Sequence, residues 1–450
     1  MQNIYLPIET KVREFHGKLL FSLLAAEAGF SVTLGGQHDL RDRLHRFPSG
    51  IYIDKSVTIR KNKWFKKCRQ IGNVVVAWDE EGLLFFDNEM YRQMRISPPA
   101  LDQVAVFFAW GHIQKEAICE KYPNASGKIR LVGNPRFDML RPEFRGFFRE
   151  EAEKLTAKYG KIILVNTNFQ LYNHFQGPVA ARKALDAYPI ARSKPGFYEG
   201  WIDISRKMFA WFARIIPVLS KSFPSHTIVL RPHPSENFQV WRELLKGFSN
   251  VEVSGEGNVV NWIMASDIMI HFNCTTGVEA FLLDTPAIVF RPFDPGYFEQ
   301  RLPNAVSIPV KKIDELIERV RAILNKEHRP AEGKSRRALF FQRYVAGYRG
   351  ALSSELILKE LQKLGPTDGG NRGSARKFIY RNAQRFGNPI KKAIDRIRYP
   401  GSDQYHLQKF PGLNKGEIAE ACLKLRKVTG RFENIGVHHV GGTCFCIRRK

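Results

Sequence analysis

Cysteine is scarce in this chain, and its few positions form no pattern. The 450 residues include six cysteines, at positions 68, 119, 274, 422, 444 and 446. Their spacings suggest no disulfide framework, which argues against a disulfide-stapled secreted fold and favours a reducing cytoplasm. Cys444 and Cys446 lack a second Cys/His pair at the spacing of a zinc site, so the sequence predicts no bound metal.

Long apolar runs are lacking as well. The longest one near the start, residues 19–30, is interrupted by Glu27. It is shorter than the roughly 20 residues that a membrane-spanning helix needs. Residues 1–7 read as a first strand and not as the charged opening of a signal peptide. We therefore expect a cytoplasmic protein that is not integral to the membrane.

Three common catalytic fingerprints are absent. The sequence has no Gly-x-x-x-x-Gly-Lys-Ser/Thr phosphate loop, no Gly-x-Gly-x-x-Gly fingerprint and no Gly-x-Ser-x-Gly elbow. The first two absences remove the main support for an ATPase or a dinucleotide-dependent oxidoreductase.

Basic residues are plentiful and unevenly placed. Lys and Arg number 70 against 44 Asp and Glu, a net charge of +26. Residues 365–450 alone carry 18 basic and 6 acidic side chains, and the stretch 376–399 interleaves aromatic residues with eight Lys/Arg. Such asymmetry indicates a polyanionic partner, either anionic lipid or nucleic acid.

Short apolar runs alternate with helical segments through most of the chain. This order favours a doubly wound α/β fold with parallel sheets. We expect an N-terminal Rossmann-like domain over residues 1–155 and a C-terminal one over residues 156–364. A basic extension over residues 365–450 follows.

Two strand-like runs in the second half end in polar turns. The first ends in Arg231, Pro232, His233 and Pro234. Because ligands bind at the carboxyl ends of parallel strands, this turn offers an imidazole and a guanidinium to a phosphate. The alternative is a turn with an incidental histidine.

The second turn comes about forty residues later and runs into a helix. Thr275, Thr276 and Gly277 offer two hydroxyls and free backbone N–H groups, and the glycine permits close approach of a phosphate. Glu279 lies one turn into that helix, where we expect it to accept hydrogen bonds from ribose hydroxyls. The alternative is an ordinary helix cap. The pair of turns favours a phosphate-bearing ligand.

Acidic side chains follow a strand in the first half. Asp79, Glu80 and Glu81 precede Gly82. Adjacent carboxylates repel one another, so we expect at least one raised pKa and a more effective base near neutral pH. The alternative is a solvated acidic loop.

Other candidates in the first half are less specific. Asn134 and Arg136 lie in a Gly-x-Pro-Arg-x-Asp turn, where Arg136 could face an anion. Arg13 and Glu14, with Glu9, lie at the start of the first helix, and the alternative there is an exposed helix face. His112 is a similar case.

Taken together, the motifs resemble those of known families. Glu80-Glu81-Gly82, His233-Pro234 and Thr275-Thr276 resemble the motif set of bacterial sialyltransferases, and capsule Kdo transferases are similar. Residues 4–14, 133–138 and 273–277 look like the surface carbohydrate biosynthesis proteins. The turn at residues 133–138 is also similar to one in CDP-glycerol glycerophosphotransferases of teichoic acid synthesis. The resemblance covers residues 1–360.

The resemblance implies a GT-B fold, in which two Rossmann-like domains face each other across a cleft. The donor nucleotide then lies in the C-terminal domain and the acceptor mainly in the N-terminal one. His233 would contact the donor phosphate and assist the departure of CMP, and Thr275 and Thr276 would bind that phosphate. The catalytic carboxylate would be Glu80 or Glu81. A third acid, Asp79, precedes the glycine here, which leaves its identity open. Two threonines stand where serines are common, and the hydroxyls are kept.

The leading hypothesis is a glycosyltransferase of surface polysaccharide biosynthesis. It would transfer a CMP-activated ulosonic acid, Kdo or sialic-acid-like, to a glycan or lipid-linked glycan, with no metal and no cofactor beyond the nucleotide-sugar. The basic tail would hold it against an anionic membrane. A CDP-polyol phosphotransferase and a sugar-nucleotide epimerase keep the same fold. A basic nucleic-acid-binding protein is an alternative of another class, but no recognition motif supports it. A binding-only relic is a last alternative.

Overall fold

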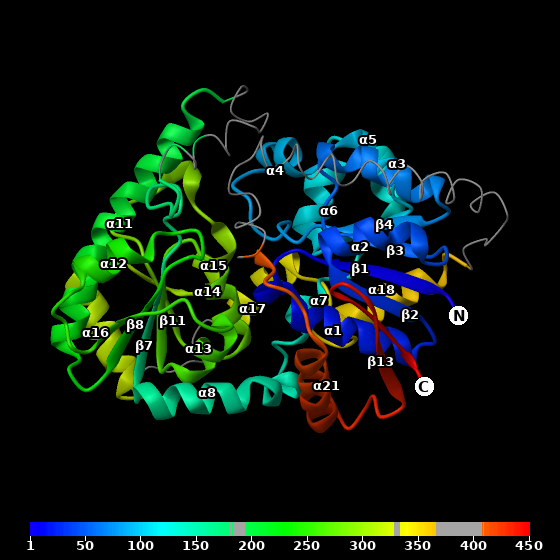
Figure 1. Cartoon of the computed structure of the whole chain (residues 1–450). Helices are drawn as coiled ribbons and strands as arrows, with labels where there is room; N and C mark the ends of the chain where they lie inside the picture. The colour runs from blue at the N-terminus through cyan, green and yellow to red at the C-terminus, as the bar shows by residue number, and fades with distance from the viewer. Residues whose placement is uncertain (178, 180–181, 183–193, 328–333, 366–406, 408) are drawn as a thin grey trace. The chain divides into compact units, whose positions relative to one another are not determined.

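The chain forms two compact units, each built around one sheet (Figure 1). The computed structural model describes all residues except 178, 180–181, 183–193, 328–333, 366–406 and 408. The first unit contains residues 1–83, 95–139 and 345–450, and the second contains residues 84–94 and 140–344. This division differs from the domain boundaries expected after residues 155 and 364.

The first unit has an eight-stranded sheet in the order β13-β14-β2-β1-β3-β4-β5-β6. Its strands are β1 (Asn3–Ile8), β2 (Ser31–Gly36), β3 (Ile51–Asp54), β4 (Val74–Trp78), β5 (Val106–Ala109), β6 (Ile129–Leu131), β13 (Ile435–Gly441) and β14 (Cys444–Arg449). Six neighbouring strands of this sheet, β2, β1, β3, β4, β5 and β6, run parallel. Side chains on both faces of β1 and β4 are buried, as in a sheet that helices cover on both sides.

The helices of the first unit connect and cover these strands. They are α1 (Lys11–Glu27), α2 (Gln37–Arg43), α3 (Asn62–Gln70), α5 (Pro98–Leu101), α6 (His112–Cys119), α7 (Pro135–Asp138), α18 (Ser353–Gln362) and α21 (Lys415–Thr429). Helix α1 is buried along most of its length, because its run of Leu, Phe and Ala side chains packs on the sheet.

The end of the chain folds into the first sheet. Strand β14 pairs antiparallel with β2, with Cys446 opposite Thr33, and β13 pairs with β14. Phe445 and Ile447 are buried. Residues 415–450 are therefore part of the first unit and not only a basic extension. The basic stretch 376–399, expected to contact a membrane, lies outside the described residues.

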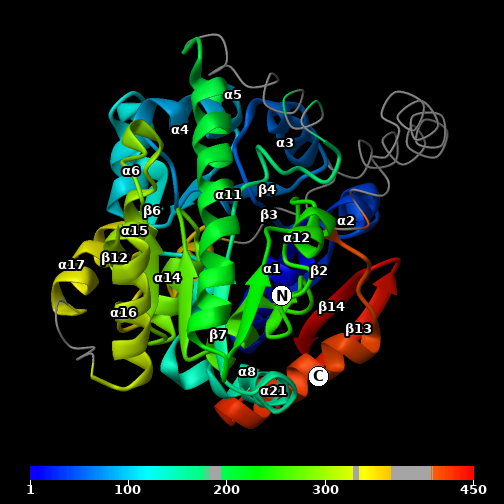
Figure 2. The same ribbon diagram turned by 90° about the vertical axis from the view of Figure 1, so that its left-hand side faces the viewer.

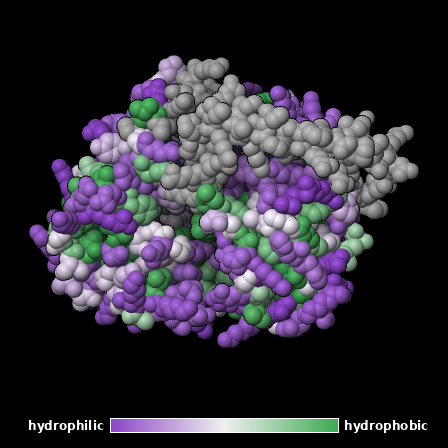
Figure 3. Space-filling view, viewed as in Figure 1, coloured by the Kyte–Doolittle hydropathy of each residue, from purple (hydrophilic) through white to green (hydrophobic). Residues whose placement is uncertain are grey.

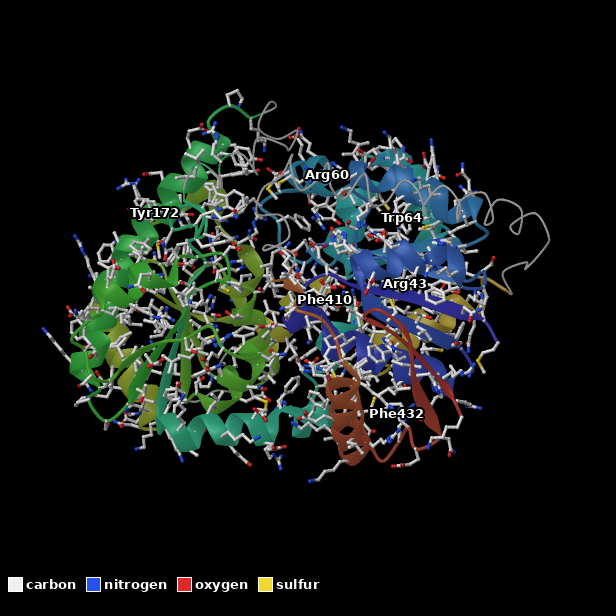
Figure 4. All side chains as sticks on the ribbon, viewed as in Figure 1. Arg43, Arg60, Trp64, Tyr172, Phe410 and Phe432 are labelled. Carbon is white, nitrogen blue, oxygen red and sulfur yellow. The ribbon has the colours of Figure 1, made fainter. Side chains whose placement is uncertain are left out.

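Two glycines of β2 make room for this C-terminal hairpin. A Cβ on Gly35 would lie 2.7 Å from the sulfur of Cys444. One on Gly36 would lie 2.7 Å from the ring of Phe410, which Figure 4 labels. The strand runs through both glycines because only their missing side chains allow this close approach.

The second unit has a six-stranded, fully parallel sheet in the order β12-β11-β10-β7-β8-β9. Its strands are β7 (Ile162–Asn166), β8 (Thr227–Arg231), β9 (Val251–Val253), β10 (Ile268–His271), β11 (Ala287–Phe290) and β12 (Ile308–Val310). Its helices are α4 (Asn88–Arg95), α8 (Gly146–Tyr159), α11 (Phe197–Ser222), α12 (Phe238–Leu244), α13 (Val259–Ala265), α14 (Thr276–Leu282), α15 (Arg301–Val306), α16 (Ile313–Leu324) and α17 (Lys334–Tyr344). Short 3-10 helices in the two units cover Leu44–Arg46, Ile59–Lys61, Pro123–Lys128, Pro142–Phe144 and Gly296–Phe298.

The core of the second unit lies between α11 and the sheet. Figure 2 shows α11 running along one face of that sheet. Its apolar residues Met208, Phe212 and Ile216 are fully buried in one cluster with Ile163 and Ile270 of the strands. Burial of this one face positions the carboxyl ends of the strands, where the candidate site lies.

Residues 84–94 pack in the second unit although both flanking segments belong to the first. Phe86 is buried and meets the ring of Trp201 edge-on, with ring centroids 5.0 Å apart. Asp87 accepts a hydrogen bond of 2.8 Å from the Lys194 ammonium. The segment that follows the acidic turn is thus anchored by an aromatic contact and an ion pair.

The described surface in the view of Figure 3 is largely hydrophilic, with scattered apolar residues. None of the helices in the described ranges is both long enough and apolar enough to cross a membrane.

Asp138 ties α18 to the first unit. Its carboxylate accepts hydrogen bonds from the backbone N–H groups of Ser353 and Ser354, both at 2.8 Å, and from the Ser354 hydroxyl at 2.7 Å. These are the N–H groups that the first turn of a helix leaves without internal partners. A buried carboxylate from residue 138 therefore brings α18 to the first unit, whereas the sequence places it in the second domain.

Replacing Asp138 by alanine removes these three buried hydrogen bonds. We expect D138A to lower the free energy of unfolding by about 2 kcal/mol or more, because a lost cap and unsatisfied buried donors both cost stability. Urea unfolding followed by circular dichroism measures the change. D102A, at an exposed aspartate of the same unit, is the control. Equal stability of the two variants would contradict the assignment.

Candidate functional site

Three strand ends meet at one edge of the second sheet. Asn166, the last residue of β7, pairs with Arg231 of β8 on one side and with His271 of β10 on the other. All three strands are parallel, so the loops that follow them start at the same edge, where α/β proteins bind ligands. The two turns predicted from the sequence thus follow parallel strands on either side of β7. The structure adds the loop after β7, which no motif in the sequence indicated.

The carboxylate of Glu236 joins two of these loops. Its Oε1 atom accepts hydrogen bonds from the Thr167 hydroxyl at 2.8 Å, the Phe169 N–H at 3.0 Å and the His233 N–H at 3.1 Å. Its Oε2 atom accepts one from the Trp241 indole at 3.0 Å. Burial raises the pKa of Glu236, and these donors oppose the rise. One side chain therefore fixes the loops after β7 and β8 together.

His233 is half-buried at the start of its turn. Its Nδ1 atom accepts a hydrogen bond of 3.2 Å from the backbone N–H of Ser235. A neutral ring held in this way carries its proton on Nε2. Pro234 follows and fixes the backbone of the turn. The N–H donor of the neutral His233 ring is therefore on Nε2.

The Arg231 side chain contacts the loop after β9 and does not have the role predicted from the sequence. Its guanidinium donates to the backbone carbonyls of Glu256 at 2.6 Å and Gly257 at 3.3 Å, and it lies 5.1 Å from the centre of the Trp262 ring. Burial lowers the pKa of Arg231 to about 10. The Arg231 side chain holds the loop after β9 in place. This geometry does not favour the phosphate contact predicted for Arg231 from the sequence.

The turn after β10 uses most of its own N–H groups. Gly277 donates to the Cys274 carbonyl at 3.0 Å, and Val278 and Glu279 donate to the Thr275 carbonyl at 2.9 and 3.2 Å. The sequence predicts free N–H groups at this helix start, and for these three residues that prediction is wrong. The side chain of Thr275 makes no capping hydrogen bond either.

The side chains of Thr275, Thr276 and Glu279 in this segment differ in their burial and in their neighbours. Thr275 is half-buried, and the Thr276 hydroxyl faces the thiol of Cys274, whose pKa is raised by burial. Glu279 is only 2% exposed. A contact between Glu279 and a ribose, as predicted from the sequence, is not favoured by this burial.

Gly277 is required by a buried histidine. A Cβ at this position would lie 2.5 Å from Nε2 of His271. That nitrogen is 2.8 Å from the Ser307 hydroxyl, which in turn donates to the Pro303 carbonyl at 2.8 Å. The glycine therefore leaves room for His271 beneath the helix start, whereas the sequence predicts that its small size admits a phosphate.

Asn273 holds the same turn from the other side. Its backbone has a positive φ of 49°. Its side chain donates to the Phe298 carbonyl at 2.7 Å and accepts from the Gln300 N–H at 3.1 Å and the Asn304 amide at 2.8 Å. Asparagine tolerates this left-handed conformation better than most residues, which is the signal that could have identified it.

In the first unit, the acidic turn after β4 separates its three carboxylates. Asp79 is fully buried and forms two hydrogen bonds with the Arg95 guanidinium. Glu80 is also buried and accepts from the Trp78 indole at 2.7 Å. The side chain of Glu81 is 46% exposed and pairs with Arg13. Of the three acids, only Glu81 is therefore open to a substrate.

Nearby cations lower the pKa values of Glu80 and Glu81, whereas the sequence predicts a raised pKa in this turn. The Arg13 guanidinium holds the pKa of Glu81 well below its usual range. Burial opposes ionisation of Glu80, yet Lys18 and Arg13 hold its pKa below the ordinary value. The prediction of a raised pKa is wrong for both residues, because each carboxylate lies beside a cation that outweighs its acidic neighbours.

Lys18, which no motif in the sequence indicated, joins this turn to the first helix. Its ammonium donates to Glu14 at 2.6 Å and to the Pro7 carbonyl at 2.7 Å, and it lies 3.3 Å from Glu80. Glu14 also accepts from the Thr10 N–H at 2.9 Å. Burial and Glu80 raise the pKa of Glu14, and Lys18 opposes this. Glu14 thus caps α1 from inside and is not part of an exposed helix face.

Gly82 completes the turn through close packing. A Cβ there would lie 2.0 Å from the side-chain nitrogen of Gln114. Gln114 accepts from the Trp110 N–H at 2.7 Å, and the Trp110 indole donates to the Asp79 carbonyl at 2.6 Å. The glycine after the acids therefore serves packing against α6.

The remaining candidates have local roles or exposed positions. The Asn134 side chain accepts from the Arg136 N–H at 2.9 Å and so caps α7. Arg136 is half-exposed, and its guanidinium lies 5.9 Å from the centre of the Phe137 ring. Glu9 pairs with Lys409 at 3.0 Å. His112 is exposed at the start of α6.

A metal site in the described ranges would need a group of His, Cys, Asp or Glu side chains. Within those ranges, no three His, Cys, Asp or Glu side chains are grouped to hold an ion.

The sequence matches no established family model and no curated protein. Among solved structures, a wall teichoic acid polymerase, TagF, is 11% identical over 80% of this chain and 88% of its own, with a TM-score of 0.51. The structure of a TagF variant covers the same shares with a TM-score of 0.50. A UDP-GlcNAc 2-epimerase from Neisseria meningitidis, bound to UDP-GlcNAc, is 13% identical over 81% of this chain and all of its own, with a TM-score of 0.49.

At such identities the likeness to TagF defines the fold alone. The chain has an α/β fold of the GT-B class with two Rossmann-like sheets, and the fold class predicted from the sequence is confirmed.

The buried His271 predicts a specific pH dependence of stability. Burial lowers its pKa to about 3, against about 6.5 in an unfolded chain. Below about pH 6.5 the unfolded chain binds a proton that the folded chain does not. The contribution of His271 is therefore complete above that pH and is lost as the pH falls toward 3, by up to about 1.4 kcal/mol per pH unit.

H271Q removes this titration. We expect the unfolding free energy of the wild type to fall more steeply than that of H271Q between about pH 6 and pH 4, as measured by urea unfolding. H112Q, at an exposed histidine, is the control and should follow the wild type. Parallel curves for the wild type and H271Q would show that His271 does not titrate as its burial requires.

Proposed function

We propose that this protein is a GT-B transferase of cell-surface polymer biosynthesis that uses a nucleotide-activated donor. The observation that carries the proposal is His233 at the carboxyl edge of the second sheet: Glu236 binds its backbone N–H, and the Ser235 N–H binds Nδ1 of its imidazole. A preoriented donor at this edge suits the phosphate of a leaving nucleotide, because it is in place before charge develops there. The likeness of the fold to a wall teichoic acid polymerase supports the same class.

The donor that we propose is a CMP-linked ulosonic acid, and the acceptor is a glycan or lipid-linked glycan. The acceptor oxygen would form a bond to the anomeric carbon, and the bond from that carbon to the phosphate oxygen would break. The electron pair leaves with CMP, and the acceptor proton passes to a carboxylate. His233 would donate from Nε2 to the departing phosphate. The half-buried Thr275 would lie along the same phosphate.

Glu81 is the carboxylate that we propose for the acceptor side. It is open to solvent, whereas Asp79 and Glu80 are buried and paired within the first unit. Arg13 keeps it ionised, so it would accept a proton only as the acceptor oxygen becomes acidic in the transition state. Asp79 and Glu80 instead hold the turn that presents it.

A CDP-polyol phosphotransferase is the second candidate. In that reaction the acceptor oxygen attacks the phosphorus of the polyol phosphate, and CMP leaves as well. His233 would have the same role in both, and TagF, whose fold this chain shares, is a wall teichoic acid polymerase. A phosphodiester in the product distinguishes this reaction from sugar transfer. For either reaction we propose that the basic stretch 376–399 binds anionic lipid near the acceptor.

Nucleotide binding tests the donor site. Calorimetry with CMP, CDP, UDP and GDP should show binding of a cytidine nucleotide, and H233A should weaken it about tenfold or more, because a hydrogen bond to a charged group is lost. The control is H226A, since His226 precedes β8 at the opposite edge of the sheet. If no nucleotide binds, or if H233A binds as tightly as H226A, the donor-site assignment is wrong.

Turnover tests the carboxylate. We expect E81Q to reduce the release of CMP from a CMP-linked donor and glycan acceptor by about 100-fold or more, with an unchanged melting temperature. E80Q should instead lower the melting temperature, because it disturbs a buried ion pair. E433Q, at an exposed glutamate, is the control. Full turnover in E81Q would exclude it as the catalytic carboxylate.

A further inference from the structure

The loop after β7 lies against the His233 turn as a short antiparallel pair. The Asn237 N–H donates to the Asn173 carbonyl at 2.8 Å, and the Phe175 N–H donates to the Ser235 carbonyl at 3.0 Å. Between these two bonds, His174 stands opposite Glu236. The same turn that carries His233 thus also fixes the backbone position of a second histidine.

Both histidines are close neighbours of Glu236. Residues directly opposite in an antiparallel pair have Cβ atoms about 4.5–5.5 Å apart, which applies to His174 and Glu236. The Glu236 N–H donates to the His233 carbonyl at 2.7 Å and closes a turn, so these two Cα atoms lie within about 7 Å. His174 and His233 thus lie on two segments that pair with each other at Glu236.

The two rings are held in the same tautomer by the same local device. Nδ1 of His174 accepts a hydrogen bond of 3.1 Å from the N–H of Gln176, two residues ahead. Nδ1 of His233 accepts in the same way from Ser235. Each neutral ring consequently carries its proton on Nε2 and can donate from that atom.

The loop that carries His174 is anchored by aromatic contacts. The ring of Tyr172, labelled in Figure 4, packs against Phe209 of α11 with centroids 5.3 Å apart. The His174 ring stacks on Phe175 at 4.9 Å. Partial burial lowers the pKa of His174, which favours the neutral ring with its Nε2 proton near pH 7. A ring held in this way loses little conformational freedom when it binds a ligand.

We propose that His174 is a second phosphate-binding residue of the donor site, donating a hydrogen bond from Nε2 to the phosphate group that His233 also contacts. The proposal rests on the proposed function, because it concerns the same nucleotide. It assigns the loop after β7 a role in binding the leaving phosphate, beyond the two turns that the sequence indicated.

Two substitutions separate phosphate binding from loop structure. In H174N the asparagine side-chain oxygen replaces Nδ1 as the acceptor of the hydrogen bond from the Gln176 N–H. The substitution removes the Nε2 donor. H174Q places an amide N–H near the position of Nε2 and loses the local acceptor. Calorimetry with CMP and with inorganic phosphate should give about tenfold weaker binding for H174N, with H174Q closer to the wild type. H226N is the matched control and should bind as the wild type does.

The outcomes distinguish this inference from the function on which it rests. If H174N binds CMP and inorganic phosphate as tightly as the wild type, or if H174Q is weakened more than H174N, His174 is not a phosphate ligand. If the wild type binds neither compound, the proposed function fails together with the inference. A melting temperature for each variant excludes general unfolding as the cause of a loss.

Discussion

One buried carboxylate, that of Glu236, holds the candidate donor site in shape. It accepts hydrogen bonds from two loops and from the indole of Trp241, so the ends of β7 and β8 cannot move apart without exposing an unpaired charge or several unpaired donors. Because one acceptor serves four donors, the loops are fixed together. The carboxylate fixes the backbone of His233, the Ser235 N–H orients its ring, and backbone hydrogen bonds to the same turn place His174.

In the first unit, buried carboxylates also hold segments together, but their partners are cationic side chains. Lys18 lies between Glu14 and Glu80, and Arg95 holds Asp79, so the buried acids and bases compensate one another. A buried charge without such a partner would be far too costly. The pairing leaves Glu81, with Arg13, as the exposed acid of the turn. Structural and candidate catalytic carboxylates are therefore adjacent in the sequence but differ in environment.

The fold was predictable because its signals are local and periodic. Apolar runs bounded by turn residues mark the parallel strands, and the turns at His233 and Thr275 follow strands of the second sheet as expected. The site was predictable only in part. The carboxylates of Glu236 and Asp138 look like ordinary polar residues in the sequence, since only burial and distant donors give them their roles. The return of residues 415–450 to β2 depends on a pairing across some 400 residues, which no local pattern encodes.

By itself, the sequence determined two doubly wound α/β halves and placed an imidazole and neighbouring hydroxyls at the ends of strands, because strand periodicity and turn chemistry are local properties. The tertiary structure decided which of three consecutive acids is exposed, why Gly277 must be small, and where Arg231 points. It also brought His174 beside the His233 turn. Those outcomes depend on which groups share a buried space, and that is set only when segments distant in the chain pack together.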